Sequence, residues 1–432
     1  EIKTEIIAVG FADLRPDPGS ELLLISNSGV FSLSSALEGY SGNIKQLFDW
    51  ELIAAVPDLE RVQFIGKVQD IDGDGEIDLL LPGDGVYGLF KGRGNETFEL
   101  VSTFSSDNAT LAAASRAGGN SGVDARIEIN AEQGVVIELN VESNSYFDDF
   151  VEQWDADQEP ARSLLRAESW MPTAVVAQLN ADALADIAYV NQGADGLGQL
   201  NFHFQDPQTG FGDTPDWTGS LDTRGDIQLV DADNDSLLDL LRITGEGNDR
   251  SAYFYRNLNG SFDLTQPNQV MRFSGYDVRF NIIPIGQDTD PLLNVSYYTI
   301  PVVDAIRNAS INRTQLLFGR DDVGENQFFN RRPNSRLDES FSAANVRGLS
   351  EQMSLQYDID GDGRKDAIYV TENGTLAAKR IDADLNIESE SFWEYVSSRS
   401  VFEFQVLQLN PDAKPDFLLR HGTATTFLVA AP

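Results

Sequence analysis

Three nine-residue stretches carry aspartate at positions 1, 3, 5 and 9, a spacing that suits the binding of a metal ion. They read DIDGDGEID from Asp70, DADNDSLLD from Asp231 and DIDGDGRKD from Asp358. Two carboxylates about 4 Å apart repel by roughly 4 kcal/mol at an effective dielectric constant near 20, so such a cluster needs a cation or full solvation. Oxygen ligands at this spacing suit calcium, with a backbone carbonyl joining at position 7.

We predict that these three complete loops bind Ca2+ through positions 1, 3, 5, 7 and 9. The predicted ligands are Asp70, Asp72, Asp74, Glu76, Asp78, Asp231, Asp233, Asp235, Leu237, Asp239, Asp358, Asp360, Asp362, Arg364 and Asp366. A solvated acidic turn is the alternative for any one copy, but three copies in one chain make chance a poor explanation.

Four further stretches keep part of the pattern and are predicted as weaker metal sites. They begin at Asp13, Gln178, Gly286 and Gln408, and their candidate ligands are Asp13, Asp17, Glu21, Asn180, Asp182, Asp186, Asp288, Asp290, Asn294, Asn410, Asp412 and Asp416. The loops from Gln178 and Gln408 either hold a weaker ion or form an internal hydrogen-bond network. In the loop from Asp13, Arg15 stands at position 3, where its guanidinium is expected to pair with Asp13, Asp17 or Glu21.

The residues around the loops predict strands rather than helices. Short apolar runs precede the loops, and β-type runs such as LLLPG after Asp78 and AIYVT after Asp366 follow them. An EF-hand would need a glutamate at position 12 and flanking helices. Position 12 is Leu81, Arg242 or Tyr369 in the three complete loops, so the EF-hand is excluded.

The spacing of the loops predicts a repeat architecture. Most successive loops begin about 55 residues apart, enough for four short strands, and four-stranded sheets repeated around an axis form a β-propeller. We predict an all-β fold with residues 1–432 as one propeller domain. The repeat length favours eight blades, with a blade lacking a calcium loop at 109–169. Seven blades with an insertion there are the alternative. Residues 1–7 are expected to complete the last blade.

Composition limits the function. The net charge is −38, which disfavours nucleic acid and anionic lipid as partners, and no apolar run reaches the length of a membrane span. The chain has no cysteine, which favours a bacterial protein that is secreted, periplasmic or on the cell surface, where calcium is plentiful. No nucleophile, cofactor or metalloprotease motif is present, and His203 in the alternating run NFHF is predicted to be structural.

The D-x-D-x-D-G-x-x-D core at Asp70 and Asp358 resembles the FG-GAP/VCBS repeat family of calcium-loop propellers. The Gly-Ala-Pro element of that family is missing and four of the seven loops are incomplete, so the closer resemblance is to bacterial VCBS-type propellers. The resemblance implies a calcium-stabilised extracellular module that binds a protein or a glycan, as in adhesion, without catalysis. A polysaccharide-active enzyme, lyase or hydrolase, and a structural subunit of a cell-surface assembly are the alternatives.

Overall fold

The computed structural model describes most of the chain. The residues outside the description are 1–5, 17–18, 34–43, 53–62, 66–67, 107–122, 131–133, 142–173, 193–196, 223–225, 247, 287–289, 300–309, 322, 325, 343–352, 372, 400, 402, 408–413, 422–423 and 431–432. None of the described residues forms a helix with the length and apolar character that a membrane crossing needs.

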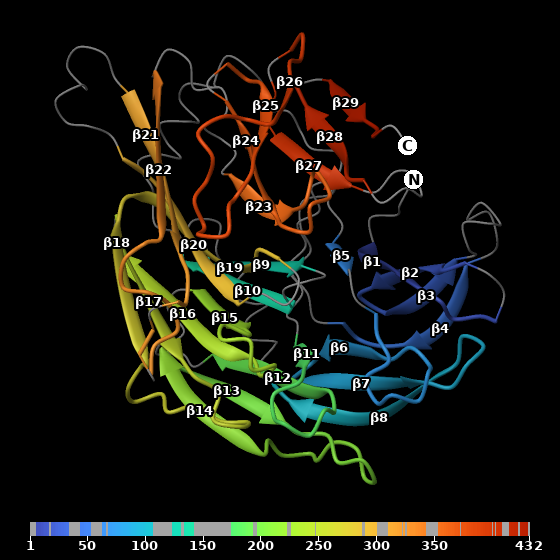
Figure 1. Ribbon diagram of the computed structural model, residues 1–432. Coiled ribbons are helices and arrows are strands. Elements are labelled where there is room, and N and C mark those ends of the chain that lie inside the picture. Colours follow the sequence, from blue (N-terminus) through green and yellow to red (C-terminus); the bar gives the residue numbers. More distant parts are fainter. Residues whose placement is uncertain are drawn as a thin grey trace.

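The described residues form seven sheets that follow one another as the blades of a propeller (Figure 1). The first sheet contains β1 (Ile6–Ala12), β2 (Glu21–Ser26), β3 (Gly29–Leu33), β4 (Lys45–Asp49) and β5 (Gln63–Ile65). The second contains β6 (Leu79–Gly83), β7 (Val86–Gly92) and β8 (Phe98–Ser105). The third contains β11 (Val175–Ala177), β12 (Asp186–Gln192), β13 (Leu197–His203) and β14 (Trp217–Asp222).

The remaining four sheets repeat the same antiparallel meander. The fourth contains β15 (Asp226–Val230), β16 (Asp239–Glu246), β17 (Asp249–Tyr255) and β18 (Gln269–Ser274), joined by β9 (Val123–Asn130) and β10 (Gly134–Val141). The fifth contains β19 (Tyr276–Pro284), β20 (Pro291–Thr299), β21 (Ser310–Phe318) and β22 (Ser335–Ser342). The sixth contains β23 (Ser354–Tyr357), β24 (Asp366–Val370), β25 (Leu376–Lys379) and β26 (Trp393–Tyr395), and the seventh contains β27 (Glu403–Leu407), β28 (Asp416–Arg420) and β29 (Thr425–Leu428).

The described residues form seven sheets, which agrees with the seven-blade alternative rather than with the preferred eight blades. Within 109–169, the described strands β9 and β10 form a hairpin whose backbone pairs with β15, through Val136–Gln228 and Ile137–Ile227. The hairpin extends an existing sheet because an isolated hairpin is only marginally stable, whereas the edge of a neighbouring sheet offers unpaired backbone groups. The rest of 109–169 lies outside the described residues.

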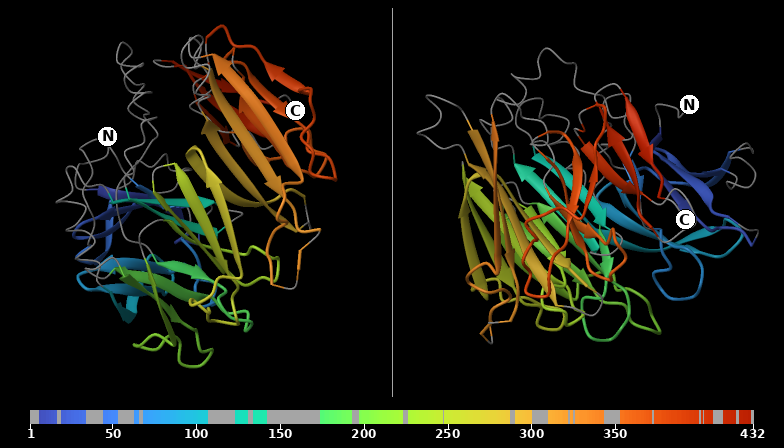
Figure 2. Two further views of the ribbon diagram at one scale, coloured as in Figure 1. Left: turned by 90° about the vertical axis from the view of Figure 1, so that its left-hand side faces the viewer. Right: turned by 45° about the horizontal axis from the view of Figure 1, so that its top comes forward.

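The predicted closure of the ring by residues 1–7 is wrong for Ile6 and Ile7. Both belong to β1, which pairs with β2 and β5, and no described strand of the seventh sheet pairs with the first. The physical reason is burial, since Ile7 is 2% exposed and packs with Leu23 and Leu79 in a core between the first two sheets. Residues 1–5 of the predicted closing strand lie outside the described residues. The sheets are seen from two further sides in Figure 2.

The hydrophobic core is divided among the contacts between neighbouring blades. One cluster joins the fourth and fifth sheets through residues such as Leu241, Phe254 and Val295. Another joins the sixth and seventh sheets through residues such as Ile368 and Phe417. Each sheet therefore buries its apolar residues against the next sheet, and the loops at the sheet ends are left to carry polar groups.

His203 lies in the core between the second and third sheets, which agrees with its predicted structural role. It is 0% exposed, its ring is stacked near Tyr189, and its two nitrogens lie 3.2 Å from Tyr189 Oη and 3.1 Å from the carbonyl oxygen of Gly212. Burial lowers the pKa of His203, against an opposing effect of the hydrogen bond to Gly212. The fold therefore favours the neutral imidazole.

This environment predicts the titration of His203. Because its pKa in the fold is lowered, its contribution to stability is full above the unfolded value near 6.5 and is lost as the pH falls through the lowered value. We expect one of the two imidazoles of the chain to titrate clearly below pH 6.5 in an NMR titration, and His203→Gln to remove that resonance. Titration near pH 6.5 of the resonance that His203→Gln removes would contradict the described burial.

Candidate metal sites in the acidic loops

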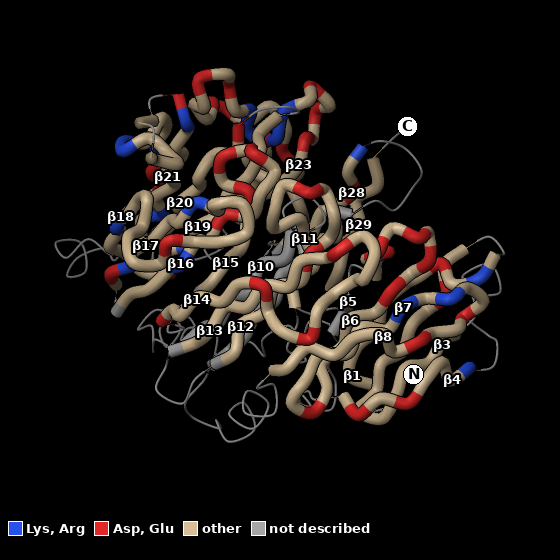
Figure 3. The backbone as a smooth tube through the Cα atoms, turned by 90° about the horizontal axis from the view of Figure 1, so that it is seen from below, with Lys and Arg blue, Asp and Glu red and all other residues tan. Residues whose placement is uncertain are grey.

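Each complete loop lies between two strands, which confirms the predicted order of strand, acidic loop and strand. The Asp231 loop joins β15 to β16, and the Asp358 loop joins β23 to β24. The Asp70 loop ends at β6 and is closed by a bridge between Gln69 and Asp78. Acidic positions recur at such loops around the molecule (Figure 3).

The carboxylate at position 9 fastens two of the complete loops to their own blades, whereas Asp366 in the third accepts the backbone N–H of Ile359 at 2.7 Å. Asp239 is 2% exposed, and it accepts the backbone N–H of Ala232 at 3.1 Å on one oxygen and the N–H of Asn257, just beyond β17, at 2.8 Å on the other. Asp78 makes the same pair of contacts, with Ile71 and Gly92. We call this arrangement the position-9 clasp.

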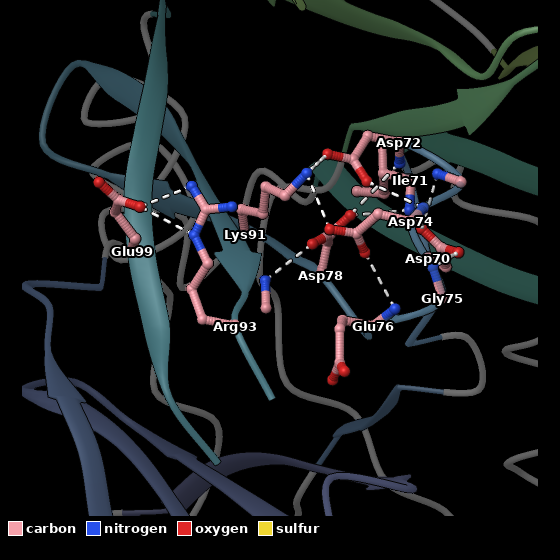
Figure 4. A network of polar contacts seen from close by, with 12 residues as sticks. Asp70, Ile71, Asp72, Asp74, Gly75, Glu76, Asp78, Lys91, Arg93 and Glu99 are labelled. Carbon is pink, nitrogen blue, oxygen red and sulfur yellow. Dashed lines mark hydrogen bonds and ion pairs between the residues drawn. The ribbon is translucent and has the colours of Figure 1, made fainter. Parts of the chain in front are cut away.

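The carboxylate at position 1 organises the turn of the loop. Asp70 accepts the backbone N–H groups of Gly73 and Gly75, each at 2.7 Å (Figure 4). Gly75, at position 6, has a φ of 93°, a conformation that glycine adopts without strain. Asp358 repeats these bonds with Gly361 and Gly363.

Three of the four predicted carboxylates come together in every complete loop. The residues at positions 1, 3 and 9 each place an oxygen within 4.8 Å of the others. The groups are Asp70, Asp72 and Asp78; Asp231, Asp233 and Asp239; and Asp358, Asp360 and Asp366. The carboxylates at position 5, Asp74, Asp235 and Asp362, are not in these groups and instead accept the N–H of position 7. Ligation by the carbonyls of Glu76, Leu237 and Arg364 stays a prediction.

The Asp231 loop contains a buried carboxylate oxygen that its neighbours do not satisfy. The Asp233 side chain is 8% exposed, and its Oδ1 is buried without a hydrogen-bond partner among the described residues. Burial raises the pKa of Asp239 to about 8, with the N–H of Asn257 acting in the opposite direction. Buried carboxylates need a compensating charge, and an all-oxygen group of this kind suits a hard ion such as calcium. The residues present therefore fit the predicted ion.

The loop from Gln178 forms an internal network of hydrogen bonds, one of the two predicted possibilities. Asp186 is 0% exposed and makes the position-9 clasp with the N–H groups of Leu179 and Gln205, each at 3.0 Å. Asn180 and Asp182 each accept a backbone N–H from within the loop. In the loop from Gln408, Asp416 is 0% exposed and accepts the N–H of Ala430 at 2.7 Å, whereas Asn410 and Asp412 lie outside the described residues.

The predicted pairing of Arg15 is confirmed with Glu21. Arg15 Nε lies 3.1 Å from Glu21 Oε1, and Glu21, at position 9, is 0% exposed. The other oxygen of Glu21 accepts the N–H of Leu14 at 2.8 Å, which is half of the clasp. Asp13 lies at the start of this loop, and Asp17 is outside the described residues.

The predicted loop from Gly286 has the wrong register. Its last position, Asn294, lies inside β20, where it is 2% exposed and accepts a hydrogen bond from Gln315 Nε2 at 2.7 Å. The strand begins at Pro291, three residues earlier, so Asn294 is a residue of the sheet rather than the end of a loop. Asp290 faces Arg320, with 4.0 Å between Oδ2 and Nε, and Asp288 lies outside the described residues.

The sequence analysis did not identify a basic side chain beside each complete loop. Arg256 Nη2 lies 2.8 Å from Asp233 Oδ2, Arg380 Nε lies 2.6 Å from Asp360 Oδ2, and Lys91 Nζ contacts Asp72. The signal in the sequence is a lysine or arginine within or one residue past the second strand after the loop. It becomes visible only when the strand register is known.

No family model matches the chain, and no curated protein matches it by sequence. Among solved structures, a lectin from Agrocybe aegerita, described for its specific recognition of non-reducing terminal N-acetylglucosamine, is similar to the chain. The sequence identity is 12%, the alignment covers 90% of this chain and 80% of the lectin chain, and the TM-score is 0.42. The function proposed below rests on the residues of this chain.

Proposed function

We propose that this chain is an extracellular β-propeller of the VCBS type whose loops bind calcium and whose blades present a non-catalytic binding surface for a glycan or a protein. The observation that carries the calcium part is the repeated group of three carboxylates in the complete loops, together with the buried Oδ1 of Asp233 that has no partner. Calcium at these positions would hold in place the connection between the two strands that flank each loop. The sign of the net charge favours a neutral or basic partner over an anionic one.

The residues of the chain have separate tasks in this proposal. Positions 1 and 3 hold the ion, and position 9 contributes to the site and, in Asp78 and Asp239, fastens the loop to the second strand after it. The ion itself neutralises the carboxylates and supplies no reaction. Propeller loops held rigid in this way lose less conformational freedom when a partner binds, which favours affinity.

Binding without turnover is the expected result of a test on carbohydrates. The purified protein is applied, with calcium and separately with a chelator, to an immobilised panel of neutral, basic and acidic polysaccharides and to the same panel in solution. We expect retention on a subset of the panel in calcium and no accumulation of reducing ends or unsaturated products. Sustained product release would contradict the non-catalytic proposal and favour the polysaccharide-active alternative. Retention on no glycan would leave a protein as the partner.

A further inference from the structure

The three basic side chains beside the complete loops occupy one equivalent place in the blade. In each blade, the residue after position 9 pairs with the last residue before the basic one; the pairs are Leu79–Phe90, Leu240–Tyr255 and Ala367–Lys379. Lys91, Arg256 and Arg380 are the next residues along the chain, within or one residue past the second strand after the loop, and therefore lie opposite the carboxylate of position 9.

Their charged groups reach the loop at position 3. Lys91 contacts Asp72 and lies 2.9 Å from Asp74 Oδ2, so its ammonium group bridges positions 3 and 5 (Figure 4). The guanidinium groups of Arg256 and Arg380 also lie over aromatic rings, 5.1 Å from Phe328 and 4.8 Å from Phe392 respectively. A cation held between a carboxylate and a ring face has a restricted position.

The incomplete loops from Gln178 and Gln408 lack this side chain at the equivalent place. The register places Phe204 opposite Asp186 and Val429 opposite Asp416, since Ile187 pairs with His203 and Phe417 with Leu428. A basic residue opposite position 9 is thus found beside the three complete loops and not beside the loops from Gln178 and Gln408. In the first loop, Arg15 brings a positive charge from position 3 itself.

The basic side chain does not saturate the carboxylates. Arg256 engages Oδ2 of Asp233, whereas Oδ1 is buried without a hydrogen-bond partner among the described residues, and Asp233 belongs to the group formed with Asp231 and Asp239. The negative charge of the loop is therefore not fully balanced by the arginine, and a second positive charge can be accommodated electrostatically. That second charge and the basic side chain repel one another, because both lie close to the same carboxylate.

We propose that Lys91, Arg256 and Arg380 are built-in counter-cations that keep the three complete loops folded when divalent cation is scarce and that lower the affinity of these loops for it. The inference rests on the proposed function, because it concerns the same loops. Without an ion, the basic group reduces the repulsion among the carboxylates. With an ion, it opposes binding, so the loops respond to changes in calcium at higher concentrations than a bare carboxylate group would.

Arg256→Gln tests the inference in the full chain. We expect the variant to melt at a lower temperature than the unmodified protein in chelator and to bind calcium roughly tenfold more tightly at one site, measured by calorimetric titration. Arg256→Lys keeps the charge and should restore the lower affinity. Arg336→Gln is the matched control, because it removes the same charge from an exposed pair with Asp338 and should leave both values unchanged.

The outcomes separate this inference from the proposed function. Calcium binding by the unmodified protein with unchanged or weaker affinity in Arg256→Gln overturns the inference alone. If the unmodified protein binds no calcium, the proposed function fails. The melting temperature of Arg256→Gln in chelator then decides the counter-cation role: a value below that of the unmodified protein supports the role, and an equal value overturns it. If Arg256→Gln does not fold, Lys91→Gln gives the same measurements in a second loop.

Discussion

We expect removal of calcium by a chelator to lower the melting temperature of the protein by on the order of 10 °C. By mass action, an ion bound to one loop would add about 2.7 kcal/mol of stability at a hundredfold excess over the dissociation constant, and three independent loops would add about 8 kcal/mol. A chain of this length converts that free energy into a shift of on the order of 10 °C. Thermal melts in calcium and in chelator, with metal analysis of the dialysed protein, measure the effect.

Magnesium and two variants give the controls for this result. Magnesium should restore the melting temperature poorly, because it requires near-octahedral geometry and keeps its waters. Asp72→Asn should remove much of the calcium-dependent gain of one loop, whereas Asn180→Ala, in a loop with a reduced ligand set, should change that gain little. A melting curve unmoved by the chelator, together with no calcium in the protein, would make the complete loops acidic turns.

The second large effect is expected at the position-9 clasp of a loop with a reduced ligand set. Asp186→Ala removes the acceptor for the N–H groups of Leu179 and Gln205, and both N–H groups lie where water is excluded. Each unsatisfied buried N–H group costs about 1–3 kcal/mol, so we expect the free energy of unfolding to fall by about 3 kcal/mol. Urea denaturation in chelator measures this loss without a contribution from metal.

Two matched variants define the clasp. Asp186→Asn keeps one acceptor oxygen and should lose about half as much stability as Asp186→Ala. Asp182→Ala, in the same loop, removes a single exposed bond to the N–H of Leu184 and should change stability by less than about 0.5 kcal/mol. Equal losses of unfolding free energy in Asp182→Ala and Asp186→Ala would show that the clasp stabilises the loop no more than an exposed hydrogen bond does.

The local pattern of the sequence was sufficient for the complete loops. Aspartate at fixed spacing predicted which residues approach one another, and positions 1, 3 and 9 do so in all three. Alternating apolar runs predicted the flanking strands. The pairing of Arg15 with a neighbouring acid followed from a cation placed among carboxylates. These predictions depend on contacts within about ten residues, where the chain has few alternatives.

Features that depend on distant pairing were not predictable in the same way. Lys91 lies opposite Asp78 only because of the register of β6 and β7, and the β9–β10 hairpin joins a strand about ninety residues farther along the chain. The position of Asn294 depends on where β20 begins, which the spacing of polar residues does not report. A residue at position 9 also looks the same in sequence whether it holds an ion or accepts backbone N–H groups.

The position-9 clasp is made alike by Asp78, Asp239 and Asp186, in loops with and without a full set of ligands. A duplicated blade can therefore lose its affinity for an ion by mutation at positions 1 and 3 while its backbone remains tied together. Descendants of such a protein are free to divide their copies into ion-responsive blades and permanently fastened ones. The number of calcium ions bound would then vary between relatives far more readily than the number of blades.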